Sequence, residues 1–297
     1  MRIYQTRRLL AEGLLPCPGP ATDVEALRKR LAAMEWEFAA EALDDQLTEA
    51  AKEASSPKAF LDALIRHELE RREERRIRLA LKISGLPSGQ TISNFDFAFQ
   101  PGVERSRIET LATCGWIREQ YTLLIQGPPG VGKTHLAAAL GVKAIETGFS
   151  VCFYRLDDLL HTMKKQGEVP MERLKYKKYM ASNLLVVDEM GFQKLTREEA
   201  NLFFRMVNYR YQRGAICLTT NKSIQEWPEI LADDEVLATA ILDRLLHASH
   251  VLNVRGRSYR LKELDDTLRA QCTVKKKRKE NEDADEAPPA AQPVPVP

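Results

Sequence analysis

The sequence has few cysteines, no long apolar run and no signal-like start. Its 297 residues include five scattered cysteines, none in CxxC spacing, so we expect a reducing compartment without disulfides or zinc. No apolar stretch approaches the roughly 20 residues that a membrane helix needs. The first residues, MRIYQTRR, also lack the apolar core of a secretory signal. These absences exclude an integral membrane protein and favour a cytoplasmic one.

A strong net charge is also missing. The chain has 44 Lys and Arg against 42 Asp and Glu, a formal charge of +2, so any contact with nucleic acid has to come from local basic clusters. The hydrophobic fraction of 44% is enough to build a full core. At roughly 150 residues per domain, the length suggests about two domains.

The first 88 residues are charged and have helical spacing. Apolar residues share one helical face from about residue 27 to residue 47, with Thr22 or Asp23 as the N-cap. A second helix is expected after Ser56 and Pro57, and it runs into mixed charges at 70–78. Such a run is more typical of a solvated helix with i,i+4 ion pairs than of a DNA-binding helix. We predict an all-α N-terminal domain, residues 1–88, that contacts DNA or a partner.

After a Gly- and Pro-rich break at 85–89, short apolar runs alternate with segments of helical spacing. This alternation predicts a parallel sheet covered by helices on both faces, within a domain at 89–271. The five expected strands lie at residues 121–126, 150–156, 183–188, 215–220 and 250–254. The remaining segment, 272–297, is basic, then acidic, then Pro-rich, and we expect disorder. Its basic part could contact phosphates, act as a nuclear localisation signal or have no function.

The strongest motif is a complete phosphate-binding loop of the form GxxxxGK[ST]. Its glycines let backbone N–H groups point at phosphate oxygens, at the positive end of the helix that follows. Lys133 is expected to reach the β- and γ-phosphates, and the Thr134 hydroxyl to bind Mg²⁺. A strand before the loop and a helix after it fit this interpretation. The loop consists of Gly127, Pro128, Pro129, Gly130, Val131, Gly132, Lys133 and Thr134, with His135 next.

An apolar strand then delivers two carboxylates at its end, Asp188 and Glu189. Asp188 is expected at the Mg²⁺ ion, and Glu189 can deprotonate a water that attacks the γ-phosphate. Paired carboxylates favour hydrolysis over transfer to a metabolite, which argues against a small-molecule kinase. On the next strand, Asn221 could bind the attacking water and the γ-phosphate.

Arg244 lies among apolar residues in the segment ILDRLL. Its guanidinium could stabilise transition-state charge on a neighbouring subunit's γ-phosphate. A pair with Asp243 or another carboxylate of the same chain is an equal alternative.

Together these motifs resemble an AAA+ ATPase of the DnaC-like group, and within it the IstB-like helper ATPases of insertion-sequence transposition. The resemblance covers about residues 20–263. Besides the motifs above, it rests on TISNFDF at 91–97, DEMGF at 188–192 and RSYRLKE at 257–263. It implies an α/β P-loop NTPase fold with a parallel five-stranded sheet sandwiched by helices, preceded by the small all-α domain.

The resemblance also implies roles. ATP and Mg²⁺ would be the cofactors, Lys133, Glu189, Asn221 and Arg244 the catalytic residues, and Thr134 and Asp188 the metal ligands. The adenine would lie near 92–95, at Phe95. The second-sensor arginine stays open among Arg255, Arg257 and Arg260. A helix at 157–180 would bind DNA, unless it is only a solvated helix, through Lys164, Lys165, Arg173, Lys175, Lys177 and Lys178.

The implied function is that of a bacterial transposition helper. It would assemble into a homo-oligomer on duplex DNA, with ATP at the subunit interfaces, and would recruit or activate a cognate transposase. A DnaC-like replicative helicase loader is the nearest alternative. A nucleotide-binding scaffold with negligible hydrolysis is another.

Overall fold

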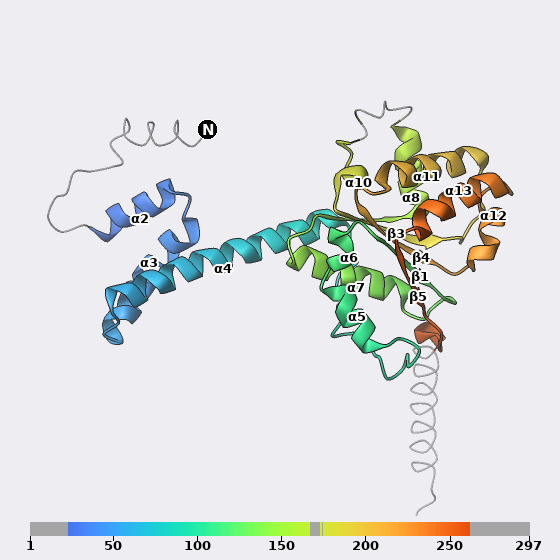
Figure 1. Cartoon of the computed structure of the whole chain (residues 1–297). Coiled ribbons are helices and arrows are strands. Elements are labelled where there is room, and N and C mark those ends of the chain that lie inside the picture. The colour runs from blue at the N-terminus through green and yellow to red at the C-terminus, as the bar shows by residue number, and fades with distance from the viewer. Residues whose placement is uncertain (1–22, 167–172, 174, 262–297) are drawn as a thin grey trace, which may run out of the picture. The chain divides into compact units, whose positions relative to one another are not determined.

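The computed structural model describes residues 23–166, 173 and 175–261. The chain divides into two compact units between Lys82 and Ile83, and Figure 1 shows the elements of each. The predicted tail at 272–297 and the possible cap Thr22 lie outside the described residues. In the described part, no helix combines the length and apolarity that a membrane span requires.

The N-terminal unit is helical, as predicted, but its first helix is interrupted. The structure has α2 (Val24–Ala33), α3 (Glu37–Lys52) and α4 (Pro57–Ser84), so the prediction of one helix from 27 to 47 is wrong. Glu35 adopts a left-handed φ of 63°, and the Trp36 N–H donates to the Leu31 carbonyl at 2.9 Å. This arrangement ends a helix, and it usually contains glycine. Because this residue is a glutamate, no glycine marks the break in the sequence.

The two predicted caps of this unit are present. The Asp23 carboxylate accepts from the Glu25 N–H at 3.4 Å, and the Ser56 hydroxyl accepts from the Ala59 N–H at 3.2 Å. A small core joins the three helices, centred on Ala39, Leu43 and Leu64.

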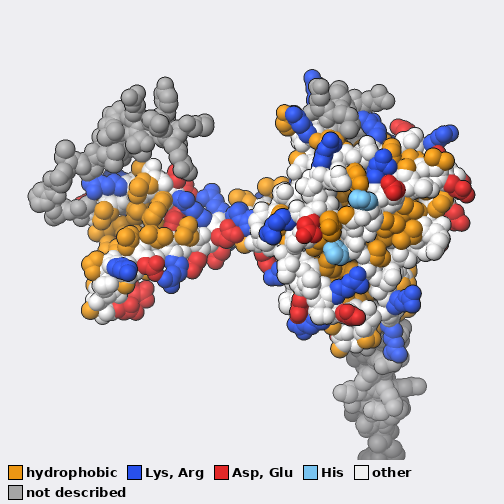
Figure 2. Space-filling view, in the orientation of Figure 1, with side chains coloured by type: hydrophobic (Ala, Val, Ile, Leu, Met, Phe, Trp, Pro, Cys, Tyr) orange, Lys and Arg blue, Asp and Glu red, His pale blue; other side chains and the backbone are white. Residues whose placement is uncertain are grey.

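The charged run of α4, residues 70–78, forms several ion pairs with nearby residues of the same unit. Arg71 pairs with Glu74 at 2.9 Å, and Arg76 pairs with Glu73 at 2.6 Å. Arg72 contacts Glu68 at 2.5 Å, and the same carboxylate accepts from the Ala39 N–H at 2.7 Å. These arginines are therefore engaged within the unit, as expected of a solvated helix. Figure 2 likewise shows basic and acidic side chains interspersed on the visible surface.

The second unit contains the predicted parallel sheet. Its strands are β1 (Thr122–Gln126), β2 (Val151–Arg155), β3 (Leu184–Met190), β4 (Ala215–Thr220) and β5 (Ser249–Asn253), in the spatial order β2-β3-β4-β1-β5. All four pairings are parallel. The central strands β1, β3 and β4 are mostly apolar because helices cover both faces of the sheet and bury these strands on both sides.

Helices form a layer on each face of this sheet (Figure 1). One layer contains α7 (Lys133–Glu146) with α5 (Arg105–Ala112) and the short α6 (Gly115–Arg118). The other contains α8 (Leu156–Lys165), α10 (Lys178–Ala181), α11 (Arg197–Arg210) and α13 (Glu235–Leu246). The turn η1 (Ile224–Glu226) and helix α12 (Trp227–Ile230) follow β4. The prediction of a five-stranded parallel sheet sandwiched by helices is confirmed.

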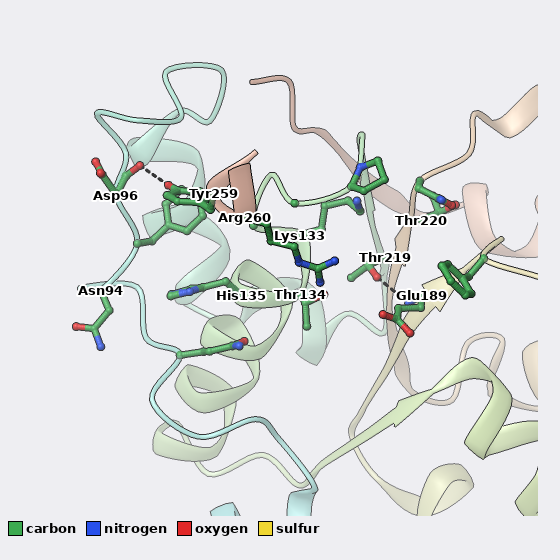
Figure 3. A pocket seen from close by; sticks show the side chains of 17 residues that line it. Asn94, Asp96, Lys133, Thr134, His135, Glu189, Thr219, Thr220, Tyr259 and Arg260 are labelled. Atoms are coloured by element: carbon green, nitrogen blue, oxygen red, sulfur yellow. Dashed lines mark hydrogen bonds between the residues drawn. The ribbon is translucent and has the colours of Figure 1, made fainter. Parts of the chain in front are cut away.

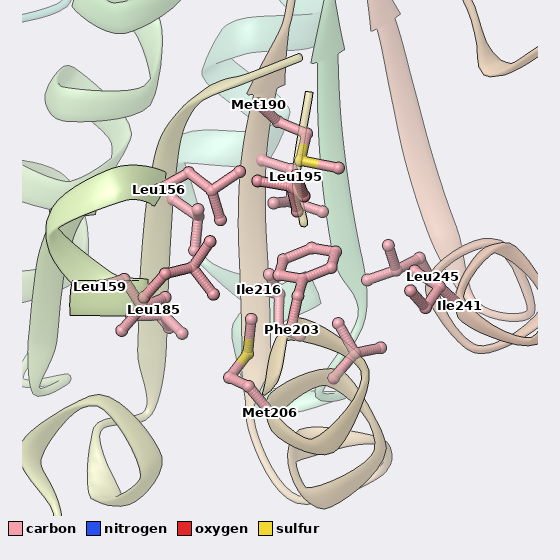
Figure 4. Close-up of a cluster of buried hydrophobic side chains, with 14 of the residues drawn as sticks. Leu156, Leu159, Leu185, Met190, Leu195, Phe203, Met206, Ile216, Ile241 and Leu245 are labelled. Atoms are coloured by element: carbon pink, nitrogen blue, oxygen red, sulfur yellow. The ribbon is translucent and has the colours of Figure 1, made fainter. Parts of the chain in front are cut away.

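The second layer holds a large apolar core, part of which Figure 4 shows. Phe203 and Met206 of α11 are fully buried between the sheet and the neighbouring helices, with Leu159 of α8 and Ile241 of α13 beside them. At Thr196, a capping box with Glu199 fixes the start of α11. The core therefore holds α8, α11 and α13 against the strands that carry the candidate site.

A buried arginine ties this layer to the sheet. Arg210, at the end of α11, is 1% exposed and donates to the carbonyls of Tyr179, Met180, Ser182, Asn183 and Ala215 at 2.7–3.3 Å. Burial lowers its pKa to about 10, so the guanidinium stays charged at neutral pH. It supplies donors to buried backbone acceptors at the end of α10, before β3 and at the start of β4.

Arg210→Ala should lower the free energy of unfolding by about 3 kcal/mol, because it leaves several buried carbonyls without donors. Arg213→Ala is the matched control, since Arg213 is exposed and donates to a single carbonyl at 3.2 Å. Urea unfolding followed by circular dichroism would measure both variants. Equal effects of the two substitutions would contradict this role for Arg210.

Candidate functional site

A cavity of about 470 Å³ opens at the carboxyl ends of the central strands, a size typical of small-molecule sites. Its walls come from the phosphate loop, the ends of β3 and β4, the segment 90–96 and the residues after β5. Figure 3 shows these side chains converging on one space. Segments that are far apart in the sequence therefore build a single pocket.

The phosphate loop connects β1 to α7, as predicted. Gly132 is the N-cap of α7 and has a φ of 93°, a left-handed conformation that favours glycine. Glycine is needed at position 127 for a different reason: a Cβ there would lie 2.2 Å from the Val254 carbonyl oxygen. The loop glycines thus allow the curled backbone and its close packing on the chain after β5.

Lys133 is the first residue of α7 and lines the cavity. Its ammonium group donates to the carbonyls of Gly127 and Pro128, both at 2.8 Å. Burial lowers the pKa of Lys133; Asp188 opposes this shift and Arg260 adds to it. A bound phosphate would favour the charged lysine and relieve this cost.

Thr134 and Asp188, the two predicted metal ligands, are in direct contact. The Thr134 hydroxyl oxygen lies 3.0 Å from both carboxylate oxygens of Asp188, and Asp188 is only 4% exposed. Two adjacent ligands of an octahedral Mg²⁺ ion are separated by about 3 Å. The oxygens present therefore fit Mg²⁺ in both chemistry and spacing.

Glu189 follows on the same strand with an unusual backbone. Its φ is 64°, and its N–H donates to the Thr219 hydroxyl at 3.0 Å. That hydroxyl in turn donates to Asp188, so β4 holds the two acidic residues of β3. The Glu189 carboxylate lines the cavity and forms an ion pair with Arg155, the last residue of β2. Neither Arg155 nor Thr219 was among the predicted site residues, although Thr219 lies two residues before Asn221 in the polar end of the same strand.

Asn221 and Arg244 lie at opposite ends of the sheet. Asn221 lines the cavity. Arg244 is near the end of α13, and β5 then begins beside Thr122, the first residue of β1. Arg244 is therefore at the amino ends of the strands, away from the cavity of its own chain.

The contacts of Arg244 are specific. Its Nε donates to the Asn208 amide at 2.9 Å, its Nη1 donates to the Ala240 carbonyl at 2.8 Å, and the guanidinium lies 5.1 Å from the Phe204 ring centroid. Within the described residues, these partners are an amide, a carbonyl and a ring rather than Asp243. The guanidinium is thus held in place without a neutralising carboxylate among these partners.

The predicted single helix at 157–180 is wrong. Helix α8 ends at Lys165, residues 175–177 form a turn, and α10 begins at Lys178. Lys164 pairs with Glu199 at 3.0 Å, which raises the pKa of the lysine, and Lys178 donates to the Ile83 carbonyl. Two of the six candidate DNA contacts are therefore engaged within the protein. Three of the others are exposed: Lys165, Arg173 and Lys175.

The other end of the cavity is aromatic. Phe95 is 5% exposed, and its ring centroid lies 5.5 Å from that of His135 and 6.1 Å from that of Tyr259. A Cβ on Gly132 would approach Phe95 to 2.8 Å and Tyr259 to 3.5 Å. The prediction placed Phe95 and His135 at the nucleotide but did not include Tyr259, although Tyr259 lies in the segment 257–263 that contributes to the family resemblance.

Of the three arginines left open, Arg260 lines the cavity, next to Tyr259. Figure 3 shows its side chain directed toward Lys133 and Thr134. Arg255 and Arg257 do not line the cavity.

These features define a P-loop nucleotide-binding protein: a complete phosphate loop, a buried aspartate beside the loop threonine and an adjacent glutamate, all at the carboxyl edge of a parallel sheet. Comparison with known proteins specifies it further. The chain belongs to the family of IstB-like ATP binding proteins, whose model matches residues 29–267.

Two curated relatives come from insertion sequences. The "Insertion sequence IS21 putative ATP-binding protein" of Pseudomonas aeruginosa is 43% identical over 242 residues, covering 81% of this chain and 89% of its own. The IS5376 counterpart of Geobacillus stearothermophilus is 41% identical and covers 69% and 81%. Among solved structures, the DnaC helicase loader covers 57% of this chain and 98% of its own, at 23% identity and a TM-score of 0.45.

Gly132→Ala should weaken ATP binding by at least tenfold, because the new methyl group would enter the space of the Phe95 ring. Gly148→Ala is the matched control. Gly148 also has a left-handed φ, 99°, but a Cβ there meets nothing within 4 Å. Both variants carry the same kind of backbone strain, of about 1 kcal/mol. Titration with a fluorescent ATP analogue would measure binding, and a similar loss in both variants would contradict the steric explanation.

Proposed function

We propose that this protein is a DNA-binding ATPase that assists the transposition of an insertion sequence. The observation that supports hydrolysis is that Lys133, Thr134 and Glu189 line one cavity, while the buried Asp188 contacts Thr134 directly behind it. Lys133 and Arg260 would bind the phosphates, and Thr134 and Asp188 would hold Mg²⁺. The ion, when bound, would neutralise charge on the β- and γ-phosphates.

Glu189 would act as the general base. As a water oxygen attacks the γ-phosphorus, one water proton passes to the Glu189 carboxylate, the bond from the γ-phosphorus to the bridging oxygen breaks, and ADP and phosphate leave. The Arg155 and Glu189 side chains are 55% and 37% exposed. An ion pair this exposed is worth about 1 kcal/mol or less, so Glu189 can leave Arg155 and turn to the water.

Arg244 would complete the site of a neighbouring subunit. It lies at the opposite edge of the sheet from the cavity of its own chain and is fixed by Asn208 and Ala240. Such a residue can reach a γ-phosphate only on another copy of the chain. ATP would then favour the homo-oligomer, because it binds the assembled state more tightly than separate subunits.

Duplex DNA would contact basic residues at and beyond the end of α8. The exposed Lys165, Arg173 and Lys175 offer salt-sensitive phosphate contacts, which suits recognition of backbone and shape over sequence. The relatives are named as proteins of insertion sequences, and this context supports a cognate transposase as the partner that receives the selected DNA.

Lys133→Ala should abolish ATP binding, whereas Glu189→Gln should bind ATP normally and lose at least a hundredfold in turnover, because only the general base is removed. Phosphate release, measured with and without duplex DNA and with no small-molecule acceptor, would test both variants. Normal hydrolysis by Glu189→Gln would refute the assignment. Phosphate release only after addition of an acceptor would indicate a kinase instead.

Arg244→Ala should lower turnover by about a thousandfold, and mixing should restore part of it. In a mixture of Arg244→Ala and Lys133→Ala chains, the intact Lys133 site of the first can receive Arg244 from the second. Each variant alone should be nearly inactive while the 1:1 mixture hydrolyses ATP. A mixture that stays inactive, although both variants still assemble, would exclude action across subunits.

A further inference from the structure

The charged residues at one end of the cavity determine how ATP would be oriented in it. Lys133, Thr134 and Glu189 line one end, where the phosphates and the attacking water belong. Asn94, His135 and Tyr259 lie at the other end of the cavity (Figure 3), and Phe95 packs against His135 and Tyr259 there. The nucleobase therefore has to lie at the aromatic end.

Three contacts hold Tyr259 in place, one through its backbone and two through its side chain. The backbone N–H of Tyr259 donates to the Gly130 carbonyl of the phosphate loop at 2.9 Å. Its hydroxyl donates to the Asp96 carbonyl at 2.7 Å, a bond that Figure 3 marks. The ring also packs on Phe99, at a centroid distance of 4.6 Å. The residue thus joins the phosphate loop to the segment that carries Phe95.

We propose that Tyr259, together with Phe95, forms the aromatic wall against which the adenine of ATP lies. This inference rests on the proposed assignment of the cavity as the ATP site. A ring already fixed by the hydrogen bond of its hydroxyl and by the contact with Phe99 loses little freedom when the base binds, so more of the contact energy appears as affinity. The chain after β5 then becomes part of the binding site.

A wall of this kind contacts the base and not the phosphates. Stacking on an aromatic ring is tolerant of base identity, because every base has a π-face. Loss of the Tyr259 ring should therefore weaken ATP and GTP alike and leave the binding of inorganic tripolyphosphate unchanged. This difference separates a contact to the base from a general disturbance of the loop at Gly130.

The test compares the Mg²⁺ complex of a non-hydrolysable ATP analogue with inorganic tripolyphosphate, measured by isothermal titration calorimetry on the full chain. Tyr259→Leu, which keeps an apolar side chain but no ring, should weaken ATP binding by about tenfold or more, with tripolyphosphate unchanged within twofold. Tyr259→Phe keeps the ring and loses only the bond to Asp96, so its ATP affinity should fall by less than threefold.

Tyr211→Leu is the matched control, because the Tyr211 hydroxyl contacts His247 at 3.3 Å and the residue does not line the cavity. An equal loss of ATP and tripolyphosphate affinity in Tyr259→Leu would overturn the proposal, as would unchanged affinity for both. Binding is measured without turnover, so the result can be interpreted even if Glu189 is not the general base. If Tyr259→Leu does not fold, Tyr259→Phe provides the test. An ATP affinity of Tyr259→Phe as low as that of Gly132→Ala would overturn the proposal, because Tyr259→Phe keeps the ring.

Discussion

The candidate site depends on the parallel pairing of β3, β4 and β1, which brings three strand ends to one edge of the sheet. In this register Gln126 of β1 lies beside Thr220, and Val187 of β3 lies beside Leu218. Thr219 of β4 can then contact Asp188, which also meets the loop threonine Thr134. A slip by one residue would turn Thr219 to the opposite face. The hydrogen bonds that position the buried carboxylate would be lost with it.

The same pairing accounts for the backbone of Glu189. The register of β3 against β4 shifts between Val187 and Met190, and Glu189 takes a left-handed conformation there. This geometry costs about 1–3 kcal/mol for a residue with a side chain. Its N–H nevertheless finds the Thr219 hydroxyl, so the strained backbone is fixed. The carboxylate is left as the part that can move between Arg155 and the cavity.

The cavity is built from both ends of the second unit. Phe95 precedes the first strand, and Tyr259 and Arg260 follow the last one. The edge strand β5 pairs with β1, and this pairing brings the chain after it across the phosphate loop, where Val254 approaches Gly127. The sheet therefore positions the loop and also the segment that closes the aromatic end of the cavity.

The sequence by itself determined the phosphate loop, the five strands and the pair Asp188–Glu189, because these rest on local patterns: glycine spacing, short apolar runs and polar residues directly after them. Only the tertiary structure decided the break at Glu35, the division of 157–180 into separate elements, and the positions of Arg155, Arg210 and Tyr259. Each of these depends on contacts between residues distant in the chain, or on a left-handed turn without glycine. Local sequence spacing predicts neither kind of feature. The contacts form only when the sheet and its helices have packed, and the turn lacks the glycine that would mark it.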